Sequence, residues 1–455
     1  MSCGAMSGKG IGTMSGARIG ATSCDPQAAC WCAELPHGPA PAMSGKDMAT
    51  TNAGCLCPVC LAHDLNATID LLGKSAAELR ALMAAFGEPA YRGTQLYKSI
   101  YANRRFDFAA MSDLPAALRE RLAAATRIAL PQVTRRYVSA DGSVRYLLSL
   151  AAVPADRDAS PARVETVFMP SEGRQTICIS TQAGCAVDCK FCLTAQLGLI
   201  RNLTAGEIVG QILLALDDHR DALVPRTNVV LMGQGEPLLN YEPVMAAVRL
   251  MLDPNGMALA PRHVTLSTSG IVPGIERLSR EKIRPKLAIS LNASSDEQRD
   301  ALMPINRKYP LKVLLEACRE YEQGNREFIT FEYVLLGGVN DTPEDARRVV
   351  RLLANLRAKV NLIPWNPIAP VRGVAKEVPV RGAAKEAEVP FRAPTPEAIE
   401  EFRRVLADKG QFAFVRYSRG QDIAAACGQL ALIESPASAA SLLPSIAVAV
   451  SPAPA

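Results

Sequence analysis

The sequence predicts an α/β fold in which a parallel sheet curls into a partial or full barrel, preceded by a small helical domain and a β-hairpin. After Glu165, short β-branched runs alternate with amphipathic helical segments over about 200 residues. Before them, apolar residues recur at helical spacing, and an Asp141-Gly142 pair separates two strand-like runs. The composition, 49% hydrophobic and 21% charged, excludes a wholly disordered, collagen-like or coiled-coil chain.

The two ends of the 455-residue chain differ in composition from its middle. Residues 1–63 are rich in Gly, Ala, Ser and Pro, and they hold seven of the 13 cysteines. We expect a disordered Cys-rich extension there, although Cys55, Cys57 and Cys60 also have a spacing typical of metal ligands. Residues 431–455 predict a disordered tail. Because no signal peptide and no apolar run of 18 residues is evident, we expect a cytoplasmic protein with no membrane partner.

A helical segment and a hairpin are expected within residues 64–150. Apolar residues at helical spacing begin at Ile69, and residues 133–138 and 143–150 predict two strands. Residues 66–150 contain twelve Lys and Arg against seven Asp and Glu, the same excess as the +5 of the whole chain. A phosphate backbone would attract such a basic patch, but a solvated surface explains it equally well. Charge alone therefore leaves nucleic-acid binding open.

The repeating part of the chain, within residues 165–430, contains six expected parallel strands. These are residues 176–181, 228–233, 263–269, 286–292, 329–336 and 360–365. In such folds the chemistry lies in the loops that follow the carboxyl ends of the strands. An imperfect duplication at residues 371–390 is interpreted as a loop insertion without chemistry.

Cys185, Cys189 and Cys192 form a C-x3-C-x2-C motif just after the first of these strands. No fourth cysteine or histidine stands at ligand spacing, so the motif predicts a metal site with an open position, rather than a closed structural site. A [4Fe–4S] cluster held by three cysteines leaves one iron free to chelate S-adenosylmethionine. The reduced cluster can then cleave the sulfonium bond and generate a 5′-deoxyadenosyl radical. A structural site is the alternative interpretation.

Other candidate residues carry weaker signals. Residues 233–237, Gly-Gln-Gly-Glu-Pro, form a turn after a strand, where residues without side chains let a ligand approach the backbone. Ser267, Ser290 and Asn366 fall at strand ends, where polar side chains can hydrogen-bond a ribose or carboxylate, although each by itself is more often a cap or turn residue. Cys178 and Cys427 are each compatible with an inert buried cysteine. Glu165 has the chemistry of a general base, but a lone glutamate at the start of a strand is usually solvated.

Six motifs, in order, resemble the RlmN/Cfr family of radical adenosylmethionine RNA methyltransferases, and its RlmN branch in particular. They are residues 165–170 (ETVFMP), 178–185 (CISTQAGC), 233–237 (GQGEP), 287–293 (LAISLNA), 363–367 (IPWNP) and 418–430 (SRGQDIAAACGQL). The resemblance extends from Asn66 to Leu430. It implies a partial (β/α) barrel behind a helical RNA-binding domain.

The resemblance also implies the cofactors and their ligands. Cys185, Cys189 and Cys192 would hold a [4Fe–4S] cluster, and each turnover would use two molecules of S-adenosyl-L-methionine. The residues implied to contact adenosylmethionine are Gly235, Glu236, Ser267, Ser290, Leu291, Asn292 and Asn366. The sequence departs from the family pattern at Gln234, where methionine is common, and at Asn292, where histidine is often found.

The resemblance further implies the catalytic roles of three residues. Cys427 would accept a methyl group from one adenosylmethionine, and a second molecule would supply the radical that converts it to a methylene radical. This radical would add to C2 of an adenine, which is electron-poor and a weak nucleophile. Glu165 would take the C2 proton. Cys178 would release the product by forming a transient disulfide with Cys427.

The implied partners are 23S rRNA and tRNA as substrates and an electron donor such as flavodoxin. The implied enzyme is a monomer. Two alternatives remain open at this point. Cfr enzymes of the same family share the chemistry but methylate C8 of adenine. A non-catalytic iron–sulfur RNA-binding protein would need neither Cys178 nor Cys427.

Overall fold

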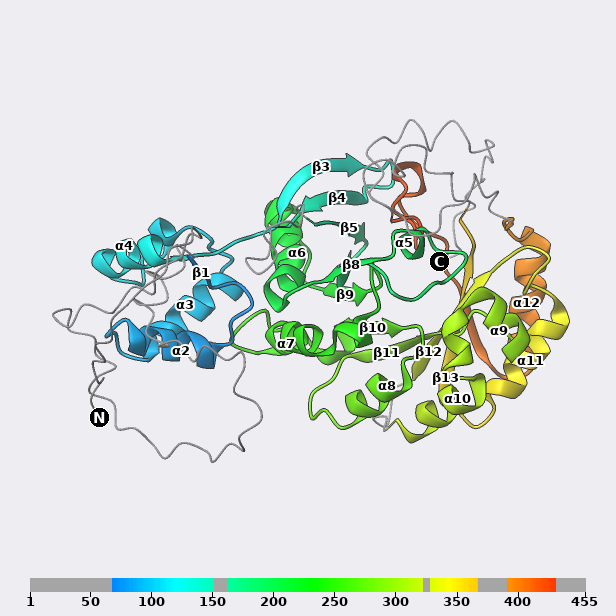
Figure 1. Ribbon diagram of the computed structural model, residues 1–455. Coiled ribbons are helices and arrows are strands. Elements are labelled where there is room, and N and C mark those ends of the chain that lie inside the picture. The colour runs from blue at the N-terminus through cyan, green and yellow to red at the C-terminus, as the bar shows by residue number, and fades with distance from the viewer. Residues whose placement is uncertain (1–67, 151–161, 322–327, 367–390, 431–455) are drawn as a thin grey trace, which may run out of the picture. The chain divides into compact units, whose positions relative to one another are not determined.

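The computed structural model describes residues 68–150, 162–321, 328–366 and 391–430 (Figure 1). The expected extension at 1–63, the tail at 431–455 and the duplication at 371–390 lie outside these residues. No helix within the described ranges has both the length and the apolar character needed to cross a bilayer.

The first described segment consists of helices and one short pair of strands. Its elements are β1 (Ile69–Asp70), α2 (Ala76–Ala85), α3 (Tyr91–Tyr101), α4 (Ala116–Ala125) and β2 (Thr126–Arg127), with β1 parallel to β2. Helix α2 begins at a capping box, in which the side chains of Ser75 and Glu78 each accept a hydrogen bond from the other residue's backbone N–H. Helices α2, α3 and α4 confirm the expected helical segment. This segment also bonds to a later part of the chain, because the Tyr97 hydroxyl donates to the Asp253 carboxylate at 2.9 Å.

A ten-stranded sheet organises most of the remaining described residues. Its parallel strands are β6 (Arg174–Cys178), β9 (Thr227–Leu231), β10 (Val264–Thr268), β11 (Lys286–Ser290), β12 (Ile329–Leu335), β13 (Ala358–Pro364) and β14 (Phe412–Val415). Its antiparallel strands are β3 (Gln132–Val138), β4 (Val144–Ser149) and β5 (Arg163–Ser171). The order is β14-β13-β12-β11-β10-β9-β6-β5-β4-β3, with β14 and β3 as the two edges. The barrel is therefore partial, as expected.

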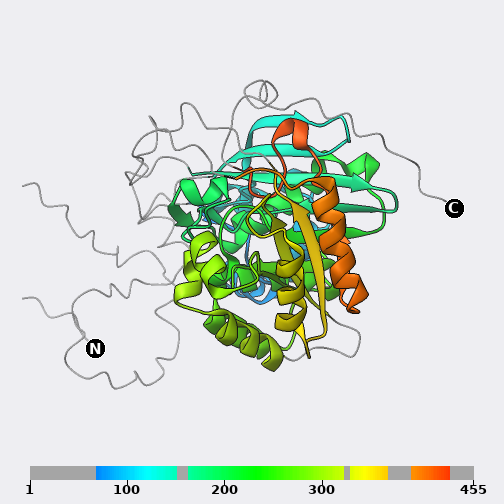
Figure 2. The ribbon, with the colours of Figure 1, turned by 90° about the vertical axis from the view of Figure 1, so that its right-hand side faces the viewer.

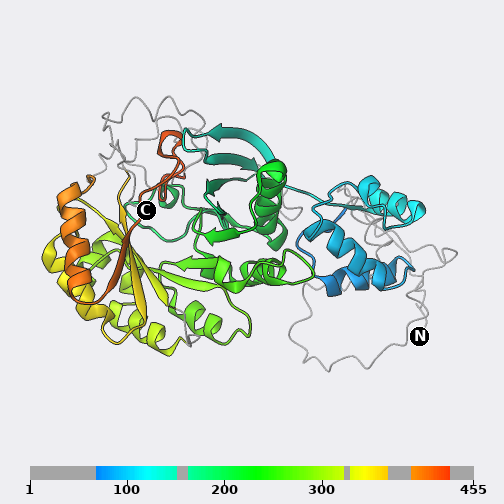
Figure 3. The ribbon, with the colours of Figure 1, turned by 180° about the vertical axis from the view of Figure 1, so that it is seen from behind.

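Helices follow the parallel strands and lie along the outer side of the sheet, which Figure 3 shows from behind. They are α6 (Ala205–Asp218), α7 (Tyr241–Leu252), α8 (Val272–Ser279), α9 (Asp296–Leu302), α10 (Leu311–Glu320), α11 (Pro343–Leu353) and α12 (Pro396–Asp408). Helix α12 lies beside the last strands in Figure 2. Capping boxes at Thr204 and Thr342 begin α6 and α11. Fully buried and partly buried residues alternate along β10 and β13, so one face of these strands is more deeply buried than the other.

All six strands expected from the sequence are present, and each ends one to three residues earlier than expected. The residues just past the strand ends leave the sheet to form the loops around the site. Strand β14 was missed because it has only four residues, and its Phe412 and Phe414 are exposed at the sheet edge. A small hairpin of β7 (Gln182–Gly184) and β8 (Leu199–Asn202) was also missed.

The hairpin of β3 and β4 was expected, and it turns at Asp141-Gly142, where Gly142 has a positive φ of 79°. Strand β4 also pairs with β5, so the hairpin extends the main sheet. This extension brings the hairpin turn to the segment that carries Cys427, drawn in red in Figure 1. The Asp141 carboxylate accepts from Gly420 N at 3.1 Å and from Arg419 Nε at 3.2 Å.

Candidate active site

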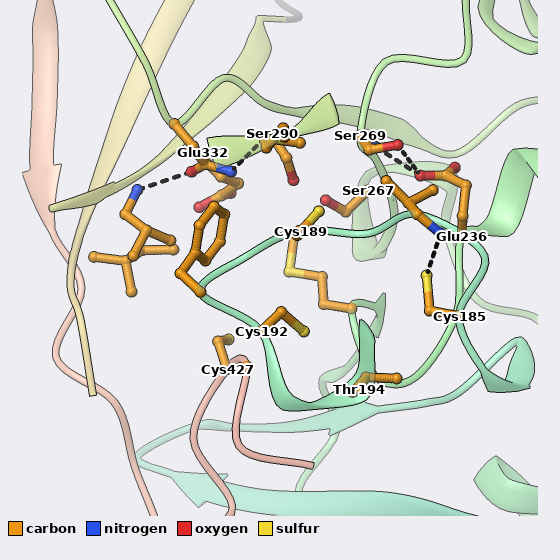
Figure 4. Close-up of a pocket in the computed structure, with 18 of the residues that line it drawn as sticks. Cys185, Cys189, Cys192, Thr194, Glu236, Ser267, Ser269, Ser290, Glu332 and Cys427 are labelled. Atoms are coloured by element: carbon orange, nitrogen blue, oxygen red, sulfur yellow. Dashed lines mark hydrogen bonds between the residues drawn. The ribbon is translucent and has the colours of Figure 1, made fainter. Parts of the chain in front are cut away.

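A cavity opens at the carboxyl ends of the parallel strands, where the fold predicts a site (Figure 4). Most of the residues singled out from the sequence line it. They are Cys185, Cys189, Cys192, Gly235, Glu236, Ser267, Ser290, Asn292, Asn366 and Cys427. Leu291, Cys178 and Glu165 are buried outside its wall.

The three motif cysteines lie on a tightly folded loop between β7 and the short helix α5 (Leu193–Gln196). The Cys185 N–H donates to the Gly198 carbonyl at 2.9 Å, and the Val187 N–H donates to the Cys185 sulfur at 3.4 Å. The Cys192 N–H donates to the Cys189 carbonyl at 3.1 Å. These bonds hold the sulfurs around one side of the cavity.

The donor set fits a [4Fe–4S] cluster better than a single ion. No three His, Cys, Asp or Glu side chains of the described residues converge closely enough to hold one metal ion. A cluster does not need such convergence, because each of its irons takes a different thiolate. Burial raises the pKa of Cys185 to about 12 and that of Cys189 well above its ordinary value. The thiols therefore stay protonated until iron replaces the protons.

An apolar wall surrounds the cysteine loop. Phe191 and Leu193 pack with Met303 and Trp365, and Cys189 and Cys192 lie against this cluster. The indole N–H of Trp365 donates to the Phe191 carbonyl at 3.3 Å. Exclusion of water by such a wall favours a radical site, because it limits side reactions of reactive species.

The turn after β9 requires glycine at position 235. Gly235 has a φ of 100°, and a Cβ placed there would lie 2.6 Å from atoms of Gln182. The Glu236 N–H donates to the Gln182 side chain at 2.8 Å. Gln234, at a position where the family commonly has methionine, is fully buried, and its side-chain amide donates to the Leu430 carbonyl at 3.4 Å. The turn thereby contacts both strand β7, which precedes the cysteine loop, and the segment near Cys427.

Glu236 joins two strand ends. Its carboxylate accepts from the Ser269 N–H at 2.7 Å and from the Ser269 hydroxyl at 2.8 Å. Burial raises the pKa of Glu236, although the Ser269 bonds favour its charged form. The sequence analysis missed Ser269, which lines the cavity two residues after Ser267.

The end of β11 carries the other expected ligand contacts. Ser290 is its last residue and faces the cavity, whereas the Leu291 side chain is fully buried. Asn292 adopts a left-handed φ of 54°, and its side-chain oxygen accepts from the Val334 N–H at 2.9 Å. Asn292, at a position where histidine is often found, therefore holds the neighbouring strand as well as lining the cavity.

Cys427 lies on a segment anchored at both sides of the cavity. The Gly428 carbonyl accepts from the Leu193 N–H at 2.9 Å, and the Leu430 carbonyl accepts from the Thr194 hydroxyl at 2.7 Å. The Asn366 amide donates to the Ser418 hydroxyl at 2.8 Å. The Cys427 side chain is open to the cavity, yet desolvation by the surrounding protein raises its pKa to about 11.

Cys178 and Glu165 share one face of the sheet beneath the Cys427 segment. Cys178 pairs with Val167, and it packs against Ile423 and Leu430. Burial raises the pKa of the Cys178 thiol. Glu165 is two residues before Val167, and thus on the same face. The alternative of a solvated Glu165 does not hold, because its side chain is fully buried in an ion pair with Arg145 on β4.

The sequence analysis also missed Glu332, a buried carboxylate on the cavity wall. It accepts from the Asn361 amide at 2.9 Å, and burial raises its pKa to about 7. The charge in the middle of the otherwise apolar strand β12 was a usable signal. It was overlooked because only residues at strand ends were considered.

The six described cysteines, Cys178, Cys185, Cys189, Cys192, Cys318 and Cys427, are all free. The structure therefore gives no support to a standing disulfide between Cys178 and Cys427. The transient disulfide that the resemblance implies belongs to the proposal below.

Two family models match the chain. The Radical SAM superfamily model covers residues 179–353, and the model of the ribosomal RNA large subunit methyltransferase N-terminal domain covers residues 69–128. The first match contains the cysteine loop and strands β9 to β12. The second coincides with the helical segment.

Curated relatives and a solved structure extend this similarity over most of the chain. A probable dual-specificity RNA methyltransferase RlmN of Koribacter versatilis is 47% identical over 365 residues, which cover 76% of this chain and 97% of that protein. The dual-specificity RNA methyltransferase RlmN of Anaeromyxobacter dehalogenans is 45% identical, with 80% and 92% covered. A radical SAM methyltransferase from Sphaerobacter thermophilus is 42% identical, with a TM-score of 0.71, covering 80% of this chain and all of the other.

The expected fold, enzyme class and cofactors, a [4Fe–4S] cluster and S-adenosylmethionine, are thus confirmed, and the non-catalytic alternative is set aside. The cavity, the cysteine loop and the similarity over most of the chain lead to one conclusion: this chain belongs to the RlmN family of radical adenosylmethionine dual-specificity RNA methyltransferases.

Proposed function

We propose that this enzyme methylates C2 of an adenosine in 23S rRNA and of the adenosine 3′ of the anticodon in some tRNAs, with Cys427 as the methyl carrier. The observation that carries the proposal is the position of Cys427 on the wall of the cavity that the cluster cysteines also line. The names of the relatives, which are dual-specificity RNA methyltransferases, support the two substrate classes.

Cys185, Cys189 and Cys192 hold the cluster, and Gly235, Glu236, Ser267, Ser290, Leu291, Asn292 and Asn366 surround adenosylmethionine in this proposal. When bound, the cluster and adenosylmethionine supply a radical that abstracts hydrogen from a carbon next to sulfur. The protein determines which carbon is within reach. Its apolar wall at Phe191 and Trp365 keeps water away.

Cys427 acts as a nucleophile before it acts as a carrier. Its thiol loses a proton, its sulfur bonds to the methyl carbon of adenosylmethionine, and the sulfonium bond to that carbon breaks. Because the Cys427 pKa is raised to about 11 by desolvation and then by the Glu332 charge, the free thiol is protonated near pH 7. Binding of the cationic sulfonium nearby favours loss of that proton.

Glu165 and Cys178 complete the proposed reaction. After the carbon–carbon bond forms, the adduct would pass one electron to the oxidised cluster, and Glu165 takes the C2 proton. The Arg145 guanidinium stabilises the Glu165 carboxylate until then. Cys178 then loses its thiol proton and attacks the Cys427 sulfur. The bond from this sulfur to the methylene carbon breaks with its electron pair on carbon, the carbon takes up a proton to become the methyl group, and a disulfide forms. A thiol reductant returns both cysteines to their reduced form. The proposal includes a flavodoxin-type electron donor and a monomeric enzyme.

The test is to trap the covalent intermediate with Cys178→Ala. The variant is purified from cells, digested with nuclease, and examined by mass spectrometry for a nucleotide on the peptide that contains Cys427. We expect an adenosine adduct joined through one added carbon. The attached ring carbon distinguishes C2 from the C8 of Cfr-like enzymes.

Cys318→Ala is the matched control, because Cys318 is also fully buried and free but lies in α10, within the main core. This control should methylate RNA and carry no adduct. An unmodified Cys427 peptide in the Cys178→Ala protein, together with full RNA methylation, would refute the two-cysteine reaction.

A further inference from the structure

Helix α9 places one arginine, Arg299, in the protein interior under the cavity. Its side chain is fully buried, and its guanidinium lies below the ends of β10 and β11. The Nε atom donates to the Leu291 carbonyl at 3.1 Å, and Nη2 donates to the Ser269 carbonyl at 2.6 Å and the Ser290 carbonyl at 3.0 Å. Nη1 donates to the Asn306 side-chain oxygen at 3.1 Å. One planar side chain therefore connects two strand ends.

The carbonyls that Arg299 binds belong to residues that build the cavity. Ser269 holds the Glu236 carboxylate with its N–H and hydroxyl. Ser290 and Leu291 immediately precede Asn292, which lines the cavity. Any displacement of the guanidinium would therefore move both sides of the adenosylmethionine site.

The same helix contacts the cysteine loop. The Lys190 N–H, next to Cys189, donates to the Leu302 carbonyl at the end of α9, at 3.0 Å. Leu302 and Met303 pack with Phe191 in the apolar wall. Helix α9 thus joins the cysteine loop to the strand ends that Arg299 holds.

The charge of Arg299 has no ion-pair partner among the described residues, since all its hydrogen-bond acceptors are neutral oxygens. Burial lowers the pKa of Arg299 to about 10, and the nearby Cys189, Asp296 and Asp300 groups oppose this shift. Asn306 connects the guanidinium to these two carboxylates, because its amide donates to Asp296 at 2.9 Å and to Asp300 at 2.8 Å. A buried cation that bonds directly only to neutral oxygens is costly, so a further anion nearby would stabilise it.

We infer that Arg299 is a positioning residue that joins the adenosylmethionine site to the cysteine loop and places a fixed positive charge beside the cluster. The three thiolates outweigh the positive charge of the oxidised core, and one-electron reduction adds a further negative charge. A nearby cation therefore stabilises the reduced form and raises the reduction potential. The inference rests on the cluster assignment and is independent of which RNA atom is methylated.

Two variants separate the charge from the geometry. In Arg299→Met both are lost, whereas Arg299→Lys keeps the charge but loses the planar fork. The cluster is reconstituted in each protein, titrated with dithionite in the presence of redox mediators, and followed by its electron paramagnetic resonance signal. Adenosylmethionine affinity is measured by calorimetry on the oxidised proteins. Neither readout requires RNA or turnover.

We expect a more negative midpoint potential for Arg299→Met, and a potential near that of the wild type for Arg299→Lys. Both variants should bind adenosylmethionine about 10- to 100-fold more weakly. This is the loss of affinity expected when a residue that orients the ligand-contacting groups is removed. Lys190→Met is the matched control: it removes a positive charge next to Cys189 in sequence, but one that is solvent-exposed and paired with Asp188. Because water screens that charge, the potential should not shift.

A wild-type potential in cluster-loaded Arg299→Met, or an equal shift in Arg299→Lys, would overturn the electrostatic part of the inference. Wild-type adenosylmethionine affinity in Arg299→Lys would overturn the positioning part. If Arg299→Met does not fold, Arg299→Gln, which also removes the charge, takes its place in both measurements. A Cys427 peptide that carries no adduct in the earlier experiment would affect the proposed function and leave these results unchanged.

Discussion

Arg145 and Arg299 are both fully buried arginines, yet they are compensated in opposite ways. Arg145 forms an ion pair with Glu165, and its guanidinium lies 4.3 Å from the centre of the Tyr137 ring. Arg299 bonds only to neutral oxygens of Ser269, Ser290, Leu291 and Asn306. The first charge is neutralised by the protein itself. The second has no direct ion pair among the described residues, and the Asp296 and Asp300 carboxylates reach it only through Asn306.

This difference separates two parts of one site. The face with Arg145, Glu165 and Cys178 lies where the antiparallel strands β4 and β5 join β6, and there Arg145 pairs with the Glu165 carboxylate. The region around Arg299 belongs to the parallel strands, at whose carboxyl ends the cavity lies. Whether a buried charge has an ion-pair partner in the protein therefore helps to distinguish a region stabilised by its own residues from one that binds a charged group.

The largest effect expected from this comparison is the loss of stability in Arg145→Met. Removal of the guanidinium leaves Glu165 buried without its cation, which costs about 3–5 kcal/mol of unfolding free energy. Denaturant unfolding of the cluster-free protein measures this loss. Arg319→Met, at an exposed position of α10, should change stability by less than about 0.5 kcal/mol.

The double variant Arg145→Met with Glu165→Gln should recover part of that stability, because it no longer leaves a buried carboxylate unpaired. If Arg145→Met loses less than about 1 kcal/mol of unfolding free energy, Glu165 has another partner or contacts water in the variant. That result would contradict the view that Arg145 alone compensates the Glu165 charge.

Glu332 extends the comparison of the two arginines to a buried acid. Its side chain accepts a hydrogen bond from the Asn361 amide, which is neutral. Burial raises its pKa from about 4.5 to about 7, so the folded protein binds its proton more tightly than the unfolded chain does. Its stabilising contribution is complete below about pH 4.5 and is lost as the pH rises through about 7. Above this range, Glu332→Gln should exceed the wild type by at most about 3 kcal/mol.

Thermal unfolding of both cluster-free proteins from pH 5 to pH 8 measures this difference. Glu276→Gln, on the exposed side of α8, serves as the control and should follow the wild type. Parallel curves for Glu332→Gln and the wild type would mean that the Glu332 carboxyl ionises without penalty, and that Asn361 and nearby water compensate its charge.

The smallest effect is expected for Arg299→Met in the cluster-free protein. The variant leaves the carbonyls of Ser269, Ser290 and Leu291 without their donor, which costs about 1–3 kcal/mol, but it also removes an uncompensated charge. With the cluster bound, the loss should be larger, because the attraction to the anionic cluster is lost as well. Denaturant unfolding of both forms under anaerobic conditions measures the two values. Equal losses would contradict an arrangement built around an anion.

Local signals in the sequence were sufficient for the fold class and for much of the cavity. The alternating strand and helix patterns identified all six expected strands, and the Cys185 motif stood out by spacing alone, whereas the turn at Gly235 was a weaker signal. Family resemblance added Cys178, Cys427 and Glu165, whose isolated signals were weak. Short edge strands such as β14 were missed, because four residues hold too little periodicity to recognise.

The sequence by itself determined where the expected strands run, which loop carries the three cysteines, and that a glycine-rich turn follows β9. Only the tertiary structure decided that Glu165 is buried against Arg145, that Glu332 faces the cavity, and that Arg299 joins the strand ends to the cysteine loop. The physical reason is that spacing along the chain is a local property. Burial and charge compensation depend instead on residues distant in sequence that only the folded sheet brings together.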